Sequence, residues 1–172
     1  LNKKVLLIGA DLRNPQLHTY ANINKNQTGL SNYLIDPSQD WKSFTMKVFD
    51  KQPQHEVLFS GAIPPNPAHL LANGNFETLI KEAKLIYDYI IVDLAPTILV
   101  TDTLLVAHLA DATICVVRAN HTDKKLIPFS IDLSKTNRLK NMNYVINGVK
   151  ENRSYGYNYN YGYNYGYGDV ES

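Results

Sequence analysis

Short apolar runs alternate along the chain with longer amphipathic segments, and this alternation predicts strands connected by crossover helices. The expected strands span residues 4–9, 56–60, 89–93, 113–118 and 144–149. They are apolar on both faces, which is typical of a parallel sheet covered by helices on each side. The pattern therefore predicts an α/β fold with an open, doubly wound, mainly parallel sheet.

The clearest helix start is at Asn66, an N-cap residue followed by Pro67 in the first helical position. This helix is expected to run to about residue 86, with a break near Gly74. A second helix is expected from about Thr101 and a third over residues 122–140, where Pro128 either kinks the helix or marks its true start. Between residues 14 and 51 the pattern is less regular, and it predicts only a short helix over residues 30–35.

The composition changes abruptly after residue 150. Seven tyrosines occupy every second position from Tyr155 to Tyr167, separated by Gly and Asn. Gly and Asn are poor strand formers, and no buried face offsets the entropy of ordering them, so we expect a flexible tail. The predicted organisation is one domain over residues 1–150 and a tyrosine-rich tail over residues 151–172.

Composition excludes several classes of function. Seventeen basic and sixteen acidic residues give a net charge of +1, so electrostatic binding of nucleic acid is not indicated. A single cysteine, Cys115, offers no disulfide and no thiolate metal site. Because no apolar run approaches the roughly 18–20 residues of a membrane helix, we expect a soluble chain in the cytoplasm. The first residue is Leu, and a strand pattern follows within a few positions, so we interpret the sequence as cut from a longer protein.

Two carboxylates follow apolar strands directly. Asp93 ends the run that begins at Tyr89, and Asp11 follows the run that begins at Val5. Ligands of such sheets bind beyond the carboxyl ends of the strands, where a carboxylate can reach a hydrated Mg²⁺. Taken singly, an Asp at this place is more often a helix cap or a turn former.

Taken together, several segments resemble the bacterial protein-tyrosine kinases of capsule and exopolysaccharide synthesis, which have a P-loop NTPase fold. The matching segments are the acidic motif at residues 5–15, the short helix at 29–34, the loop and helix at 60–71, the Walker B strand at 90–96 with Thr101 and Asp102 after it, and the tyrosine-rich end. The loop is the most discriminating match, because two prolines before Asn66 and Pro67 are rare by chance.

The resemblance implies an ATP-dependent, non-specific protein-tyrosine kinase that phosphorylates itself, with ATP and Mg²⁺ as cofactors. Asp11 and Asp93 would be the catalytic, metal-holding residues. Arg13 would contact phosphate, or else pair with a carboxylate, and Asn147 would contact adenine, or else form a turn before Gly148. The implied phospho-acceptors are Tyr155, Tyr157, Tyr159, Tyr161, Tyr163, Tyr165 and Tyr167. Asp102 would belong to the outer shell of the metal site, or else carry a charge in the first turn of a helix.

The resemblance also implies partners and a location. The parent protein would lie on the cytoplasmic side of the inner membrane. There it would be tied to the membrane domain of a polysaccharide chain-length regulator, which is either fused upstream or separate. Self-association of the parent is expected, and nucleic acid is not an expected partner.

Two departures from the family pattern bear on catalysis. None of the nine glycines is followed by Lys, so the sequence contains no Gly-x-x-x-x-Gly-Lys-Ser/Thr loop. We therefore expect this chain alone to be inactive, with unpaired strand edges and an exposed apolar face where the loop's strand lies in the family. Gly9 stands where the family has the first Asp of Asp-x-Asp-x-Arg, the proposed base, so Gly9→Asp is expected to raise activity.

Two alternatives stay open on the sequence alone. A partitioning or septum-site type P-loop ATPase shares the two carboxylates but calls for neither the proline-rich loop nor the tyrosine tail. A non-catalytic interaction or phospho-acceptor module is favoured by Gly9 and by the missing loop.

Overall fold

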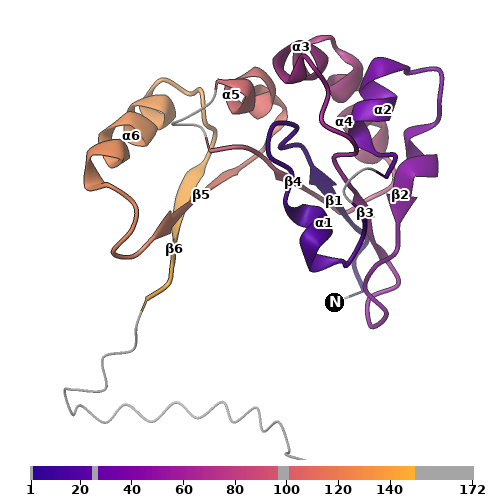
Figure 1. Ribbon diagram of the computed structural model, residues 1–172. Helices are drawn as coiled ribbons and strands as arrows, with labels where there is room; N and C mark the ends of the chain where they lie inside the picture. The colour runs from indigo at the N-terminus through magenta and orange to yellow at the C-terminus, as the bar shows by residue number, and fades with distance from the viewer. Residues whose placement is uncertain (1, 25–26, 97–100, 150–172) are drawn as a thin grey trace, which may run out of the picture.

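A computed structural model describes residues 2–24, 27–96 and 101–149 (Figure 1). The larger sheet has the strand order β2 (Thr45–Met46), β3 (His55–Leu58), β1 (Val5–Gly9) and β4 (Tyr89–Asp93). Strand β1 pairs in parallel with β3 and β4, and β2 is antiparallel to β3. A second, parallel pair consists of β5 (Thr113–Arg118) and β6 (Met142–Asn147). The mainly parallel α/β prediction is confirmed, although the described strands form two sheets instead of one.

The predicted helical regions are present in order, together with short helices that were not predicted. The helices are α1 (Leu17–Tyr20), α2 (Leu30–Ile35), η1 (Trp41–Phe44), α3 (Pro67–Ala72), α4 (Asn75–Ala83), α5 (Asp102–Val106), η2 (Ala107–Leu109), η3 (Lys124–Leu126) and α6 (Ile127–Lys135). The expected break near Gly74 is confirmed, because Gly74 has a φ of 89° between α3 and α4. Pro128 lies in the first turn of α6 and therefore marks the start of that helix.

The core lies between the larger sheet and the helices above it in Figure 1. Leu6 and Ile8 of β1 are fully buried against side chains of α2 and α4, among them Leu34, Phe76 and Leu79. Burial of a side chain of this size contributes about 1.5–3 kcal/mol, so these contacts hold β1 in the middle of the sheet. The loop that follows β1 therefore starts from a rigid position.

One face of β4 and β5 is left uncovered by the described residues. Tyr89 and Ile91 of β4 are 60% and 55% exposed, and Ile114 and Val116 of β5 are both 66% exposed. Within the described part of the chain, β4 pairs only with β1, and β5 pairs only with β6. The prediction of helices on both faces is therefore wrong for these strands. The unpaired edges and the exposed apolar face agree with the expectation from the missing loop.

The predicted tail at residues 151–172 lies outside the described residues, and with it all seven candidate phospho-acceptors. Among the described helices, none is long and apolar enough to cross a membrane.

Candidate functional site

The structure brings Asp11 and Asp93 to the same edge of the larger sheet. Gly9 of β1 and Asp93 of β4 are paired, and the backbone N–H of Ala10 donates to the carbonyl oxygen of Asp93 at 2.7 Å. Asp11 follows immediately beyond this last hydrogen bond. Because carboxyl ends of parallel strands meet at one edge, the two side chains leave neighbouring strand ends together.

Asp11 is held in a tight turn. Its Oδ1 accepts hydrogen bonds from the backbone N–H groups of Arg13 at 3.1 Å and Asn14 at 2.9 Å. A short carboxylate that binds amides two and three residues ahead is a common way to close such a turn. Among the described residues, none donates a hydrogen bond to the other oxygen, Oδ2.

The electrostatics of the site favour a cation. Partial burial raises the pKa of Asp93, and the negative charge of Asp11 raises it further. Hard carboxylate oxygens suit Mg²⁺, which keeps several waters and is commonly bound through one or two carboxylates together with substrate phosphates. No group of three or more His, Cys, Asp or Glu residues in the described chain is placed to hold a metal. Asp11 and Asp93 could supply two carboxylate ligands to Mg²⁺, with water and substrate phosphate as the others.

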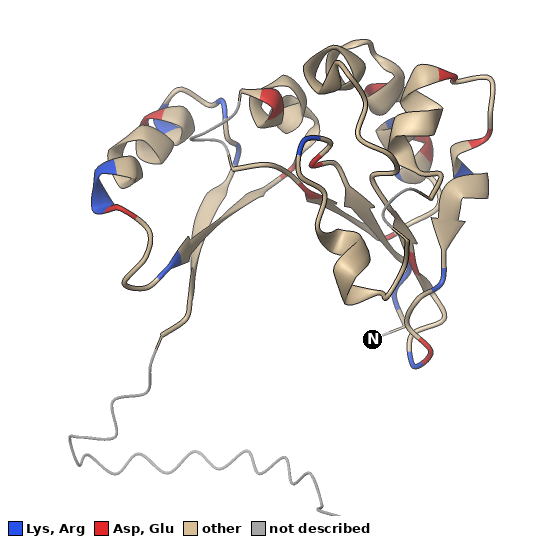
Figure 2. Cartoon of the chain, in the orientation of Figure 1, with Lys and Arg blue, Asp and Glu red and all other residues tan. Residues whose placement is uncertain are grey.

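Arg13 forms an ion pair with Asp102. Its Nε and Nη2 donate to Oδ2 and Oδ1 of Asp102 at 2.6 and 3.0 Å. Asp102 is only 3% exposed, at the start of α5, and Figure 2 shows this acidic turn near the basic part of the loop after β1. One of the two predictions for Arg13, that it pairs with a carboxylate, is thus confirmed. Its contact with phosphate stays a prediction, as does an outer-shell role of Asp102.

A second contact of α5 was missed from the sequence. The hydroxyl of Thr103 is buried and donates to the carbonyl oxygen of Ala95 at 2.6 Å. Ala95 lies two residues beyond Asp93. The available signal is the polar run Thr101 to Thr103 directly before an apolar helix. It was interpreted only as a helix start and, at Asp102, as an outer-shell residue or a first-turn charge.

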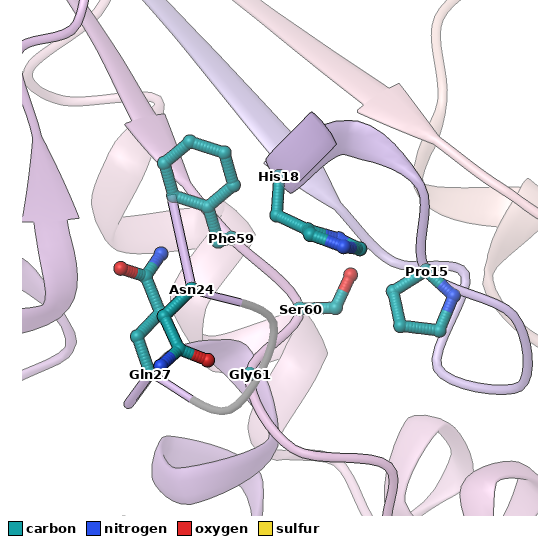
Figure 3. Close-up of a pocket in the computed structure, with 7 residues that line it drawn as sticks. All are labelled: Pro15, His18, Asn24, Gln27, Phe59, Ser60 and Gly61. Carbon is teal, nitrogen blue, oxygen red and sulfur yellow. The ribbon is translucent and has the colours of Figure 1, made fainter. Parts of the chain in front are cut away.

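A small pocket adjoins the acidic loop at the carboxyl ends of β1 and β3. Its lining includes Pro15 and His18 from the segment after β1, and Phe59, Ser60 and Gly61 from the segment after β3 (Figure 3). The hydroxyl of Ser60 donates to the carbonyl oxygen of Gly9 at 2.8 Å, so the pocket floor is tied to the end of β1.

Asn147 lies apart from the carboxylates, at the end of β6 in the smaller sheet. Its Oδ1 accepts a hydrogen bond from the backbone N–H of Gly148 at 2.7 Å, and Gly148 has a φ of 70°. A turn at this place is one of the two interpretations made from the sequence. The adenine contact stays a prediction.

Known proteins with similar sequences are kinases. The chain is 36% identical over 158 residues to tyrosine-protein kinase YwqD of Bacillus subtilis, a match that covers 90% of the chain and 65% of that protein. It is 33% identical over 154 residues to tyrosine-protein kinase CpsD of Streptococcus agalactiae serotype III, covering 89% of the chain and 65% of that protein. The chain thus spans slightly less than two thirds of these relatives. No model of a protein family matches the sequence.

Solved structures give the same relationship. The kinase domain of the Escherichia coli tyrosine kinase ETK superposes with a TM-score of 0.79 at 28% identity, covering 94% of the chain and 62% of that structure. A chain of the MinC:MinD cell division protein complex of Aquifex aeolicus superposes with a TM-score of 0.66 at 20% identity. This match covers 86% of the present chain and 57% of that structure, and at this identity it shows the shared fold alone. Sequence and fold thus agree on the same relatives, and the chain's homologues are bacterial capsule-region tyrosine-protein kinases.

Proposed function

We propose that the chain forms the catalytic part of an ATP-dependent protein-tyrosine kinase that phosphorylates itself and regulates the synthesis and export of capsular or exopolysaccharide. The observation that carries this proposal is the meeting of Asp11 and Asp93 at one sheet edge in a chain whose homologues are tyrosine-protein kinases. Phosphoryl transfer depends chiefly on positioning the reactants and on neutralising negative charge. Paired carboxylates at strand ends serve that purpose through a divalent cation.

Asp93 and Oδ2 of Asp11 would hold Mg²⁺, directly or through water. Bound Mg²⁺ would neutralise charge on the ATP phosphates. Asn147 would contact adenine, and Arg13 would add positive charge beside the phosphates while it stays paired with Asp102. The tail tyrosines from Tyr155 to Tyr167 would accept the phosphoryl group.

The phosphate-binding loop of the kinase family is not present in these 172 residues. With no Gly-Lys-Ser/Thr loop in the sequence, nothing replaces its amides and its lysine. Loss of one preorganised donor costs about 10²–10³ in rate, and here several are missing. We therefore expect residues 1–172 alone to bind Mg²⁺-ATP weakly and to be inactive. Low-micromolar ATP affinity in calorimetry of this chain would contradict the expectation.

The proposed setting is the one that the family resemblance implies. The kinase would work at the cytoplasmic side of the inner membrane, bound or fused to the membrane domain of a polysaccharide chain-length regulator. The proposed acceptor role of the tail requires self-association, in which the tail of one copy reaches the site of another.

A second candidate is a non-catalytic phospho-acceptor module, which Gly9 at the position of the family's proposed base favours. A partitioning or septum-site ATPase is less well supported, because a protein of that class is only 20% identical to the chain and shows the fold alone.

The test is phosphorylation of the full-length protein with labelled ATP and Mg²⁺. We expect Asp11→Asn and Asp93→Asn each to lower tyrosine autophosphorylation at least about 100-fold without unfolding the protein. Asp88→Asn is the matched control, because Asp88 precedes the opposite end of β4. Normal activity in both site variants would refute the site. A native protein that is phosphorylated only by another kinase would establish the acceptor module.

A further inference from the structure

The first turn of α5 contacts both loops that carry the candidate metal-binding carboxylates. Asp102 binds Arg13, which lies two residues after Asp11. The neighbouring residue, Thr103, binds the carbonyl oxygen of Ala95, which lies two residues after Asp93. One helical turn thus ties the ends of two different strands.

We propose that Asp102 and Thr103 are positioning residues that fix the separation of Asp11 and Asp93 and so set the affinity of the site for its divalent cation. This inference rests on the proposed function, because it assumes that the two carboxylates bind the metal. In this proposal, α5 positions the two carboxylates, whereas a first-turn charge at Asp102 would stabilise only the helix itself.

The connection from Asp102 to Asp11 is short and stiff. The guanidinium of Arg13 meets Asp102 through two hydrogen bonds, a geometry that fixes the plane of the group. The backbone N–H of Arg13 simultaneously donates to Oδ1 of Asp11. Because Arg13 is held at both its side chain and its backbone, a displacement of Asp102 is transmitted to the turn that orients Asp11.

The connection through Thr103 is equally direct. The Thr103 hydroxyl and the Asp102 carboxylate are both buried, with residue exposures of 7% and 3%. A buried donor or acceptor left without a partner carries a desolvation penalty, so both contacts favour one position of the turn. The like charges of Asp11 and Asp93 repel each other and so favour separation of the two loops. The contacts of Asp102 and Thr103 oppose this separation.

The test measures metal binding separately from catalysis in the full-length protein. Binding of Mn²⁺ alone is followed by the loss of the free-ion EPR signal, and the Mg²⁺ concentration for half-maximal autophosphorylation is measured beside it. The variants are Asp102→Asn, Arg13→Lys and Thr103→Val, with Thr103→Ser as the conservative variant that keeps the hydroxyl. Glu77→Gln is the matched control, because Glu77 forms an exposed ion pair with Lys81 on α4.

We expect Asp102→Asn and Thr103→Val to weaken Mn²⁺ binding and raise the Mg²⁺ requirement about tenfold, because each loses a contact that positions the metal-binding loops. Arg13→Lys keeps the charge but loses the two-point contact, so its effect should be smaller. Thr103→Ser and Glu77→Gln should resemble the unmodified protein. If Asp102→Asn fails to fold, the comparison of Thr103→Val with Thr103→Ser decides the question.

Two results overturn the proposal in distinguishable ways. If Asp11→Asn and Asp93→Asn abolish Mn²⁺ binding while folded Asp102→Asn and Thr103→Val bind within twofold of the unmodified protein, the positioning role is wrong and the metal site stands. If Asp11→Asn and Asp93→Asn also leave Mn²⁺ binding unchanged, the metal site itself is wrong, and the positioning role falls with it.

Discussion

The side chain of Ser60 occupies the space that any side chain at position 9 would need. A Cβ added to Gly9 would lie 2.9 Å from Oγ of Ser60 and 3.3 Å from its backbone nitrogen. The same Oγ donates to the carbonyl oxygen of Gly9, and Ser60 is buried. Gly9 and Ser60 therefore pack closely, and a side chain at position 9 requires Ser60 to shift.

This pair refines the expectation that Gly9→Asp raises activity. Gly9→Asp alone should lower the melting temperature, because the new Cβ approaches Ser60 more closely than packed atoms normally do. Gly9→Asp combined with Ser60→Gly should recover part of the lost stability and show the higher kinase activity. Thermal unfolding and autophosphorylation of the full-length protein check both statements, with Ser60→Gly alone as the control. Equal melting temperatures for Gly9→Asp and the unmodified protein would show that the pair is not a constraint.

The ionised Asp93 carboxylate is expected to lower the stability of the folded protein, although the proposed catalysis needs it. Burial and the charge of Asp11 raise its pKa, which means that the folded state disfavours its ionised form. In metal-free buffer at neutral pH, Asp93→Asn should therefore raise the melting temperature of the full-length protein while it removes Mg²⁺-dependent phosphorylation. Differential scanning calorimetry in the presence of a chelator measures the gain. A lower melting temperature would mean that the Asp93 carboxylate has a structural role.

Asp88, just before β4, should behave in the opposite way. The Lys3 ammonium and the backbone N–H of Lys4 bind its carboxylate and lower its pKa from the ordinary value of 3.8. A carboxyl group with a lowered pKa stabilises the fold above its ordinary pKa and loses that contribution as pH falls through the lowered value. Asp88→Asn should thus slightly lower the melting temperature at pH 7, and the difference should disappear in strongly acidic buffer. Since the pair is exposed, the effect is small and should shrink further at high salt.

The sequence alone was sufficient for features that depend on local pattern. Tyr89–Asp93 and Thr113–Arg118 were predicted with the bounds that the structure shows, because each is a short apolar run with clear ends. The helix α1 and the strand β2 were missed, since four and two residues are too few to show a period. The pairing of Arg13 with Asp102 joins positions 89 residues apart, and only the tertiary fold brings them together.

Trp41 of η1 anchors the segment before β3 to the core. Its side chain is only 1% exposed. Its Nε1 also donates to Oε2 of Glu82 on α4 at 2.7 Å. Trp41→Phe should cost about 1–2 kcal/mol of unfolding free energy through the lost hydrogen bond, and Trp41→Ala about 3–5 kcal/mol. Urea titration of the full-length protein would separate the two values, and a cost near zero for Trp41→Phe would show that the hydrogen bond contributes nothing.

The uncovered face of β5 predicts how residues 1–172 behave in isolation. Ile114 and Val116 are both 66% exposed on a strand that pairs on one side only among the described residues. Exposed apolar strands with a free edge promote association between chains. We expect sedimentation to show concentration-dependent self-association, which the pair of substitutions Ile114→Lys and Val116→Lys should reduce without loss of secondary structure.

The control for this experiment is Leu85→Lys, because Leu85 is 87% exposed but does not lie on a strand. That substitution replaces a highly exposed apolar side chain away from the free edge and should leave the association unchanged. In the full-length protein, the β5 double variant should lower the melting temperature if further residues cover this face, since two charges would then be buried. A 172-residue chain that stays monomeric at high concentration would show that the exposed face of β5 does not drive association.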